Sequence, residues 1–252
     1  MKFRFKAFGL HLLGSAIVLT LVLGGLYLGW YRWPGWYLTN VVHVAAIVGS
    51  VDLTLGPLVT LIIANPGKPR RELARDVSVI VAVQLAALIY GAATLWSGRP
   101  LYYTFSKDRL EIVQASDLDA EEIDLGRKQN PTLAPHWYSL PRWVWAPLPQ
   151  DPEERSRIVA GVVMGSGADV IQMPRYFKPW VQGEPELLTE LKAVDHFAIF
   201  SKEQKQTLKD RMARLGFATD QPITLFLTGN GRSVLAVFDP HTRQIKAMLQ
   251  AD

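Results

Sequence analysis

The sequence predicts a membrane protein with three transmembrane α-helices, followed by a C-terminal soluble α+β domain with antiparallel strands. Apolar residues gather into three long blocks before about residue 97, whereas from Arg99 onward they alternate with charged residues, prolines and short periodic runs. The average composition, 49% hydrophobic and 20% charged over 252 residues, hides this division because it is ordinary for a globular chain. We therefore expect a membrane domain at residues 1–97 and one soluble domain at residues 98–252.

The first apolar block covers residues 7–31 and contains few polar side chains. About 20 helical residues cross a hydrocarbon core of about 30 Å, so this block is long enough to span a membrane. Basic residues precede it, as they do in a cleaved signal peptide. However, the block is longer than the apolar part of a signal peptide, and it ends in Trp30-Tyr31-Arg32-Trp33. That ending is typical of an aromatic belt at a membrane surface and predicts a retained span.

The second and third blocks cover residues 41–64 and 77–96, and both are also long enough to span a membrane. Residues that break helices lie between the blocks, at Pro34-Gly35 and at 65–69. The short connections predict a tight antiparallel three-helix bundle, in which every helix satisfies its backbone hydrogen bonds internally, as lipid requires.

Basic residues near the ends of the spans predict the orientation, because Lys and Arg are retained on the cytoplasmic side. Seven of them flank the start of the first span or occupy the second loop, whereas the first loop offers only Arg32. The seven are Lys2, Arg4, Lys6, Lys68, Arg70, Arg71 and Arg75. We therefore expect a cytoplasmic N-terminus in a bacterial inner membrane and a periplasmic domain from residue 98. These cations also account for the net charge of +4, so the sequence does not predict a nucleic-acid partner.

The soluble domain shows alternating apolar residues typical of strands and several helix-capping signals. Asp151 followed by proline predicts a helix start, Ser201 and Gln204 have the spacing of a capping box, and Gly229-Asn230-Gly231 predicts a hairpin turn. The predicted strands are 101–105, 109–113, 223–228, 233–238 and 244–249, and the predicted helices are 151–161, 184–194 and 201–215.

A proline-rich tract at residues 131–149 carries the aromatic residues Trp137, Tyr138, Trp143 and Trp145. Its prolines exclude a regular helix. Two interpretations stay open: an extended loop that packs on the domain through its aromatic rings, or a loop that binds a partner or a membrane surface.

The sequence shows no pattern of catalytic or metal-binding residues. Its five histidines lack the helical spacing of metal ligands, and cysteine is absent. Met164-Gly165-Ser166-Gly167 lacks the first glycine of a nucleophile elbow. We expect no enzyme activity, no catalytic or metal site and no cofactor.

Asp52 is the conspicuous polar residue of the predicted spans, and Gly56 and Pro57 follow it in the same block. Pro57 cannot donate to the carbonyl of Leu53, so a kink is expected there. One interpretation is a hydrogen bond from Asp52 to Gln84 of the third span, which would fix the helix packing. The alternative is a small membrane transporter or proton-relay component built around Asp52.

Five stretches of the sequence are familiar as a set: AFGLHLL (7–13), VDLTLGPLVTLI (51–62), NPGKP (65–69), RP (99–100) and DRLEIV (108–113). Together they closely resemble the TfpX/TfpZ family of type IV pilin accessory proteins. The resemblance covers essentially the first 120 residues. It implies a non-enzymatic, chaperone-like protein of the inner membrane that promotes the stability, assembly or surface display of the major type IV pilin. The implied partners are the major pilin and the pilus assembly machinery. On this resemblance we expect the helices to contact the apolar helix of the pilin and the soluble domain to contact its head.

Overall fold

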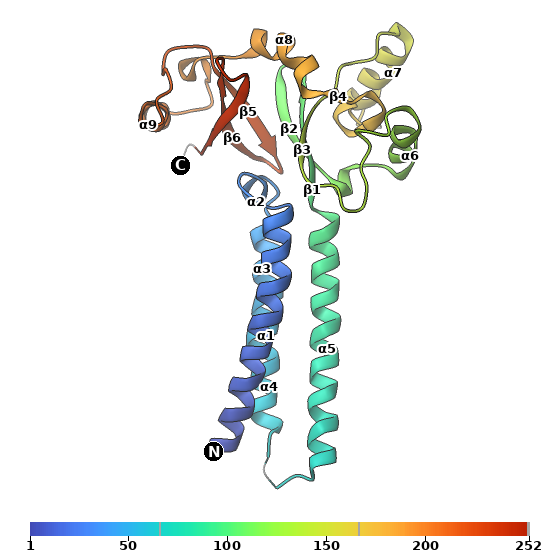
Figure 1. The fold of residues 1–252 in the computed structure, drawn as a ribbon, viewed down its shortest axis with the longest axis vertical. Helices are drawn as coiled ribbons and strands as arrows, with labels where there is room; N and C mark the ends of the chain where they lie inside the picture. The colour runs from blue at the N-terminus through green and yellow to red at the C-terminus, as the bar shows by residue number, and fades with distance from the viewer. Residues whose placement is uncertain (66, 166, 251–252) are drawn as a thin grey trace. The chain divides into compact units, whose positions relative to one another are not determined.

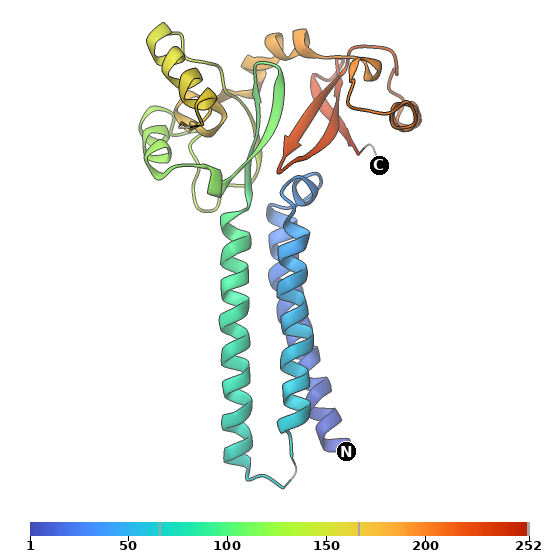
Figure 2. The same cartoon turned by 180° about the vertical axis from the view of Figure 1, so that it is seen from behind.

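The computed structural model describes residues 1–65, 67–165 and 167–250 of the chain. These residues form two compact units, which meet in the sequence between Arg99 and Pro100. Figure 1 and Figure 2 draw the ribbon from opposite sides. The division lies close to residue 97, where the apolar blocks of the sequence end.

The first unit contains three long apolar helices. They are α1 (Lys2–Gly29), a second helix made of α3 (Val41–Ser50), the π-helical turn η1 (Val51–Leu55) and α4 (Gly56–Ile63), and α5 (Arg70–Ser97). A short helix, α2 (Gly35–Leu38), follows α1. Each of the three is long and apolar enough to cross a membrane, and at most 28% of its most apolar window is buried by protein. Lipid must therefore cover most of this surface, and the prediction of three membrane helices is confirmed.

Two of these helices begin earlier than the predicted spans. α1 begins at Lys2 and α5 at Arg70, because the apolar pattern marks the part that lipid covers and not the end of the helix. At the start of α5 the extra turns are polar, and Lys68 Nζ lies 2.8 Å from Asp76 Oδ2. Glu72 thus places an acidic side chain in the first turn of α5, where its negative charge interacts favourably with the positive end of the helix dipole.

The bundle runs up, down and up. Trp30 after α1 packs edge-on against Trp96 of α5 at 4.8 Å between ring centroids, so α1 and α5 are parallel. Tyr31 Oη also donates to the carbonyl of Leu95 at 2.5 Å. The second helix runs in the opposite direction. It approaches α5 closely, because a Cβ atom on Gly91 would lie only 2.3 Å from the side chain of Val48.

The second unit is built on one sheet in the order β4-β3-β1-β2-β5-β6-β7. The strands are β1 (Pro100–Ser106), β2 (Arg109–Gln114), β3 (Arg142–Trp145), β4 (Lys178–Pro179), β5 (Thr224–Gly229), β6 (Arg232–Asp239) and β7 (Gln244–Leu249). The β1–β2 hairpin and the β5-β6-β7 meander are antiparallel, as predicted. Two parallel pairings, β1 with β3 and β2 with β5, join these pieces and were not predicted from the sequence.

Within the described residues, four α-helices accompany the sheet: α6 (Ala120–Gln129), α7 (Pro152–Val163), α8 (Trp180–Glu190) and α9 (Lys202–Arg214). The predicted caps are present, since Asp151 accepts from the backbone of Glu154 and Ser201 and Gln204 form a reciprocal capping box. α8 lies earlier than predicted. It ends at Glu190 because Lys192 instead exchanges backbone hydrogen bonds of 2.9 and 3.0 Å with Thr224 at the start of β5.

Apolar clusters of the described residues stabilise this α+β domain, and we consider two of them. The first lies around β1, β2 and β3 and includes the fully buried Tyr102 and Val144. The second joins α9 to the meander, with Leu208 and Met212 fully buried against Leu235 and Val237. In Figure 1, α6 and α7 lie on one flank of the sheet and α9 on the other.

We expect Leu208→Ala to lower the free energy of unfolding of the α+β domain by about 2–5 kcal/mol, because it leaves a cavity in the second cluster. The control is Leu215→Ala, at a side chain that is 55% exposed, which should change it by less than about 0.5 kcal/mol. Urea midpoints of the full-length protein in detergent, read by proteolysis of the domain, check this. Equal midpoints for the two variants would contradict the packing of α9 on the sheet.

Candidate functional site

The candidate site within the membrane helices is organised by the π-helical turn η1 around Asp52. In an α-helix the N–H of residue 57 would bond to the carbonyl of Leu53, and in a π-helix to that of Asp52. Pro57 has no N–H and can make neither bond. The helix therefore widens by one π turn directly before the proline, where the sequence predicted a kink.

Gln84 supplies a donor that the proline cannot. Its Nε2 atom donates to the backbone carbonyl of Asp52 at 3.1 Å across the gap between η1 and α5. The predicted interhelical partners thus meet, but through the backbone of Asp52 and not through its carboxylate. A buried carbonyl without a partner is costly in lipid, so this bond ties α5 to the second helix.

Gly56 leaves the space that Gln84 occupies. A Cβ atom at this position would lie 2.1–2.2 Å from the terminal amide atoms of Gln84. The three site residues on the second helix therefore have distinct effects: Pro57 disrupts the backbone ladder, Asp52 presents the carbonyl, and Gly56 admits the side chain that bonds to it.

Asp52 is 4% exposed, and its Oδ1 atom has no hydrogen-bond partner among the described residues. The same holds for Oε1 of Gln84. Close by, His11 Nδ1 of α1 and Thr60 Oγ1 of α4 share a hydrogen bond of 2.6 Å. His11 and Thr60 were not among the site residues predicted from the sequence. The signal was present, because an ionisable side chain in a span usually faces the bundle interior.

These residues lie beside a cavity of about 400 Å³ between α1 and α5. Asp52, Thr60 and Gln84 line it together with His11, and apolar or small side chains form the rest of its wall. The arrangement places hydrogen-bonding groups inside an apolar surface.

The proline-rich tract of the α+β domain divides into two parts. Trp143 and Trp145 belong to β3 and pack inward: Trp143 stacks on Tyr103 at 4.8 Å between ring centroids. A Cβ atom on Gly183 of α8 would lie 2.4 Å from the ring of Trp145, so this contact is close. Both tryptophans thus contribute to the packing of the sheet.

The tip of the tract is different, because Trp137 is 73% exposed and Tyr138 58% exposed. The Tyr138 ring stacks on His136 at 5.5 Å between centroids, which gives the tip a defined shape. Of the four aromatic residues proposed for partner binding, only these two have most of their surface accessible.

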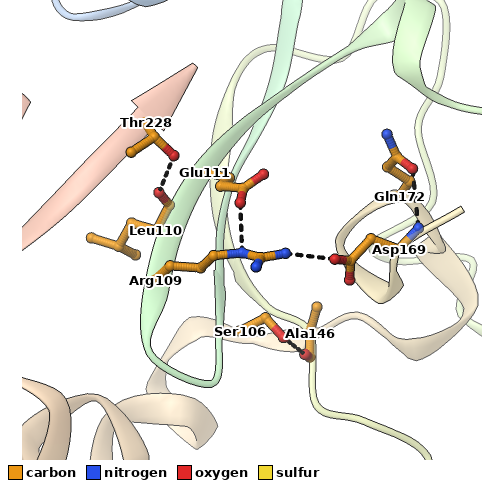
Figure 3. A network of polar contacts seen from close by, with 8 residues as sticks. All are labelled: Ser106, Arg109, Leu110, Glu111, Ala146, Asp169, Gln172 and Thr228. Atoms are coloured by element: carbon orange, nitrogen blue, oxygen red, sulfur yellow. Dashed lines mark hydrogen bonds and ion pairs between the residues drawn. The ribbon is translucent and has the colours of Figure 1, made fainter. Parts of the chain in front are cut away.

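A polar network fixes the β1–β2 hairpin to the neighbouring segments (Figure 3). Arg109 contacts Glu111 and Asp169, at 2.5 Å in each case. Burial raises the pKa of the Glu111 carboxyl, and the Arg109 guanidinium opposes that rise. Ser106 donates to the carbonyl of Ala146 at 2.8 Å. Each of these polar groups has a partner within the domain, so we interpret the network as one that stabilises the fold.

Among the residues that the structure describes, no group of three or more His, Cys, Asp or Glu side chains could hold a metal ion. The Gly229-Asn230-Gly231 segment lies at the β5–β6 connection, where it makes a hairpin turn.

Comparison with known proteins identifies relatives named for fimbriae. A fimbrial assembly protein of serogroup I from Dichelobacter nodosus is 27% identical over 235 residues, which cover 90% of this chain and 87% of the relative. The serogroup E1 protein of the same organism is 28% identical with the same coverage. The protein of serogroups C1 and C2 is 31% identical over 121 residues, 48% of this chain and 92% of the relative. No family model and no solved structure matches.

We expect Gly56→Ala to destabilise the helix bundle by about 1 kcal/mol, because the new methyl group displaces Gln84 from the carbonyl of Asp52. Gly24→Ala is the matched control, since a Cβ atom there meets no described atom within 4 Å. Thermal unfolding of the full-length protein in detergent measures both.

A double-mutant cycle isolates the contact. In a Gln84→Ala background the additional cost of Gly56→Ala should disappear. An unchanged cost in that background would mean that Gly56 acts through some other contact than Gln84.

Proposed function

This chain belongs to the family of fimbrial assembly proteins, and from that membership we propose that it is a non-enzymatic, chaperone-like accessory protein for the major pilin of type IV pili. The observation that carries the proposal is the match of 90% of the chain to relatives named fimbrial assembly proteins. A match of that length includes residues of both the membrane helices and the α+β domain. The names describe assembly and no reaction. The more specific resemblance to the TfpX/TfpZ family stays a prediction.

The division of the chain into two units supports this role. A pilin subunit waits in the membrane as one apolar helix with a globular head outside the lipid. We propose that the three helices contact the pilin helix and that the α+β domain contacts the head. Two linked contacts raise the effective concentration of each, so the pair would hold together even if either contact alone were weak.

The proposal requires the α+β domain to lie on the periplasmic side of the inner membrane, where pilin heads are found. An extracytoplasmic reporter such as alkaline phosphatase, fused after residue 252, should be active. The same reporter fused within 68–75 should be silent, because the basic residues of this segment are retained in the cytoplasm. The reverse pattern of activities would contradict both the orientation and the proposed contact with the head.

Recognition of a particular pilin should lie in the α+β domain. Apolar helices resemble one another, whereas heads offer varied polar surfaces that can be accepted or rejected. We expect pilin preference to follow residues 98–252 when they are exchanged with those of the serogroup I or serogroup E1 relative. Surface pili and membrane pilin are measured in cells that express one pilin at a time. A preference that stays with the helices would place recognition within the membrane.

Within the domain, the exposed tip of the tract is the candidate contact. Trp137→Ala and Tyr138→Ala should reduce pilus number severalfold while leaving the folded amount of this protein unchanged, because both side chains are mostly exposed. Val181→Ala, at a side chain that is 65% exposed on α8, is the matched control and should have no effect. Full pilus number in both aromatic variants would exclude the tip from recognition.

A further inference from the structure

The cavity beside Asp52 has the form of a groove for another helix. Its α1 wall includes Ala7, His11, Gly14 and Val18, and its α5 wall includes Val77, Val81, Gln84 and Leu88. Both sets have the same spacing of four, three and four residues. This is the spacing at which side chains of one helix pack against a neighbouring helix. Two parallel helices thus present matching seams to a common space of about 400 Å³.

Small residues on the α1 wall let another backbone approach closely. Ala7, Gly14 and Ser15 all line the cavity, and a Cβ atom on Gly14 would meet no described atom within 4 Å. Small residues at such positions are characteristic of close helix–helix contacts within membranes.

Two buried acceptors lie at the groove without a donor. Asp52 is 96% buried, since only 4% of its surface is exposed, and its Oδ1 atom and Oε1 of Gln84 have no hydrogen-bond partner among the described residues. Both residues line the cavity. An unpaired polar group in an apolar surrounding costs free energy, so these oxygens favour an occupant that brings a donor.

We propose that this groove binds one transmembrane helix of the assembly substrate, with a hydrogen-bond donor of that helix against Asp52 and Gln84. The identity of the occupant rests on the proposed function. Asp52 stands midway along the apolar stretch Val41–Ile63, so the donor lies near the middle of the incoming helix. A lipid chain fills the apolar walls but leaves both acceptors unpaired, and a small polar solute leaves the two seams uncovered.

The test uses the full-length protein in phospholipid vesicles and two synthetic helices of about 20 leucine and alanine residues. One helix carries a central Asn, and the other has Leu in that place. Binding is measured by energy transfer between a dye on each helix and one on the protein. We expect the Asn helix to bind roughly three- to tenfold more tightly, the range that interhelical hydrogen bonds in membranes produce.

Four variants assign the effect to the groove. Asp52→Leu should abolish the preference for the Asn helix, whereas Asp52→Asn, which keeps an acceptor oxygen, should retain it. Gly14→Leu fills the groove and should weaken binding of both helices. Gly24→Leu, on the same helix but away from the cavity, should bind as the wild type does. Circular dichroism of each variant verifies that the bundle remains helical.

Equal binding of the two helices by the wild type would overturn the proposal, as would a preference that survives Asp52→Leu. Proton flux through wild-type vesicles that Asp52→Leu abolishes, with no preference for either helix, would assign the site to transport. Pilus assembly in cells that lack this protein is measured separately. Normal pili in those cells would refute the proposed function while leaving a preference of the groove for the donor-bearing helix intact.

Discussion

The membrane part of this protein depends on one constraint: in hydrocarbon, no water is available to pair a backbone group that its own helix leaves unpaired. Pro57 creates such a group in the middle of the second helix. Three features accommodate the missing donor: the π turn η1, the hydrogen bond from Gln84 to the carbonyl of Asp52, and the space that Gly56 leaves for the Gln84 side chain. One missing N–H thus accounts for the hydrogen bond that ties α5 to the second helix.

The same constraint, that a polar group in hydrocarbon needs a hydrogen-bond partner within the protein, also applies at the groove. The bond between His11 and Thr60 satisfies two polar side chains of α1 and α4, whereas Oδ1 of Asp52 and Oε1 of Gln84 stay unpaired among the described residues. A bundle built only for stability would pair them or replace them with apolar residues. Their position in an apolar cavity is better explained by a partner that arrives from the membrane.

Much of the architecture follows from local sequence signals, and the parts that do not follow depend on distant contacts. The three spans, the β1–β2 hairpin and the capped start of α9 were predicted, because each depends on periodicity or on residues within one turn. The parallel pairings of β1 with β3 and of β2 with β5 join segments that are far apart in the chain, so no local pattern predicts them. For the same reason the sequence could not separate the packed Trp143 from the exposed Trp137. Asp52 and Gln84 were predicted as neighbours, but the use of the backbone carbonyl follows from the π turn, which only the structure reveals.

A photo-crosslinking amino acid placed at Val81, on the α5 wall of the groove, tests most directly in living cells whether the groove holds the membrane helix of a pilin. The control is Val83, whose side chain is 66% exposed and lies outside the cavity. We expect the major pilin to be captured from position 81 through its membrane helix and hardly at all from position 83. Equal capture from both positions, or none from either, would contradict the claim that this protein holds a pilin subunit within the membrane.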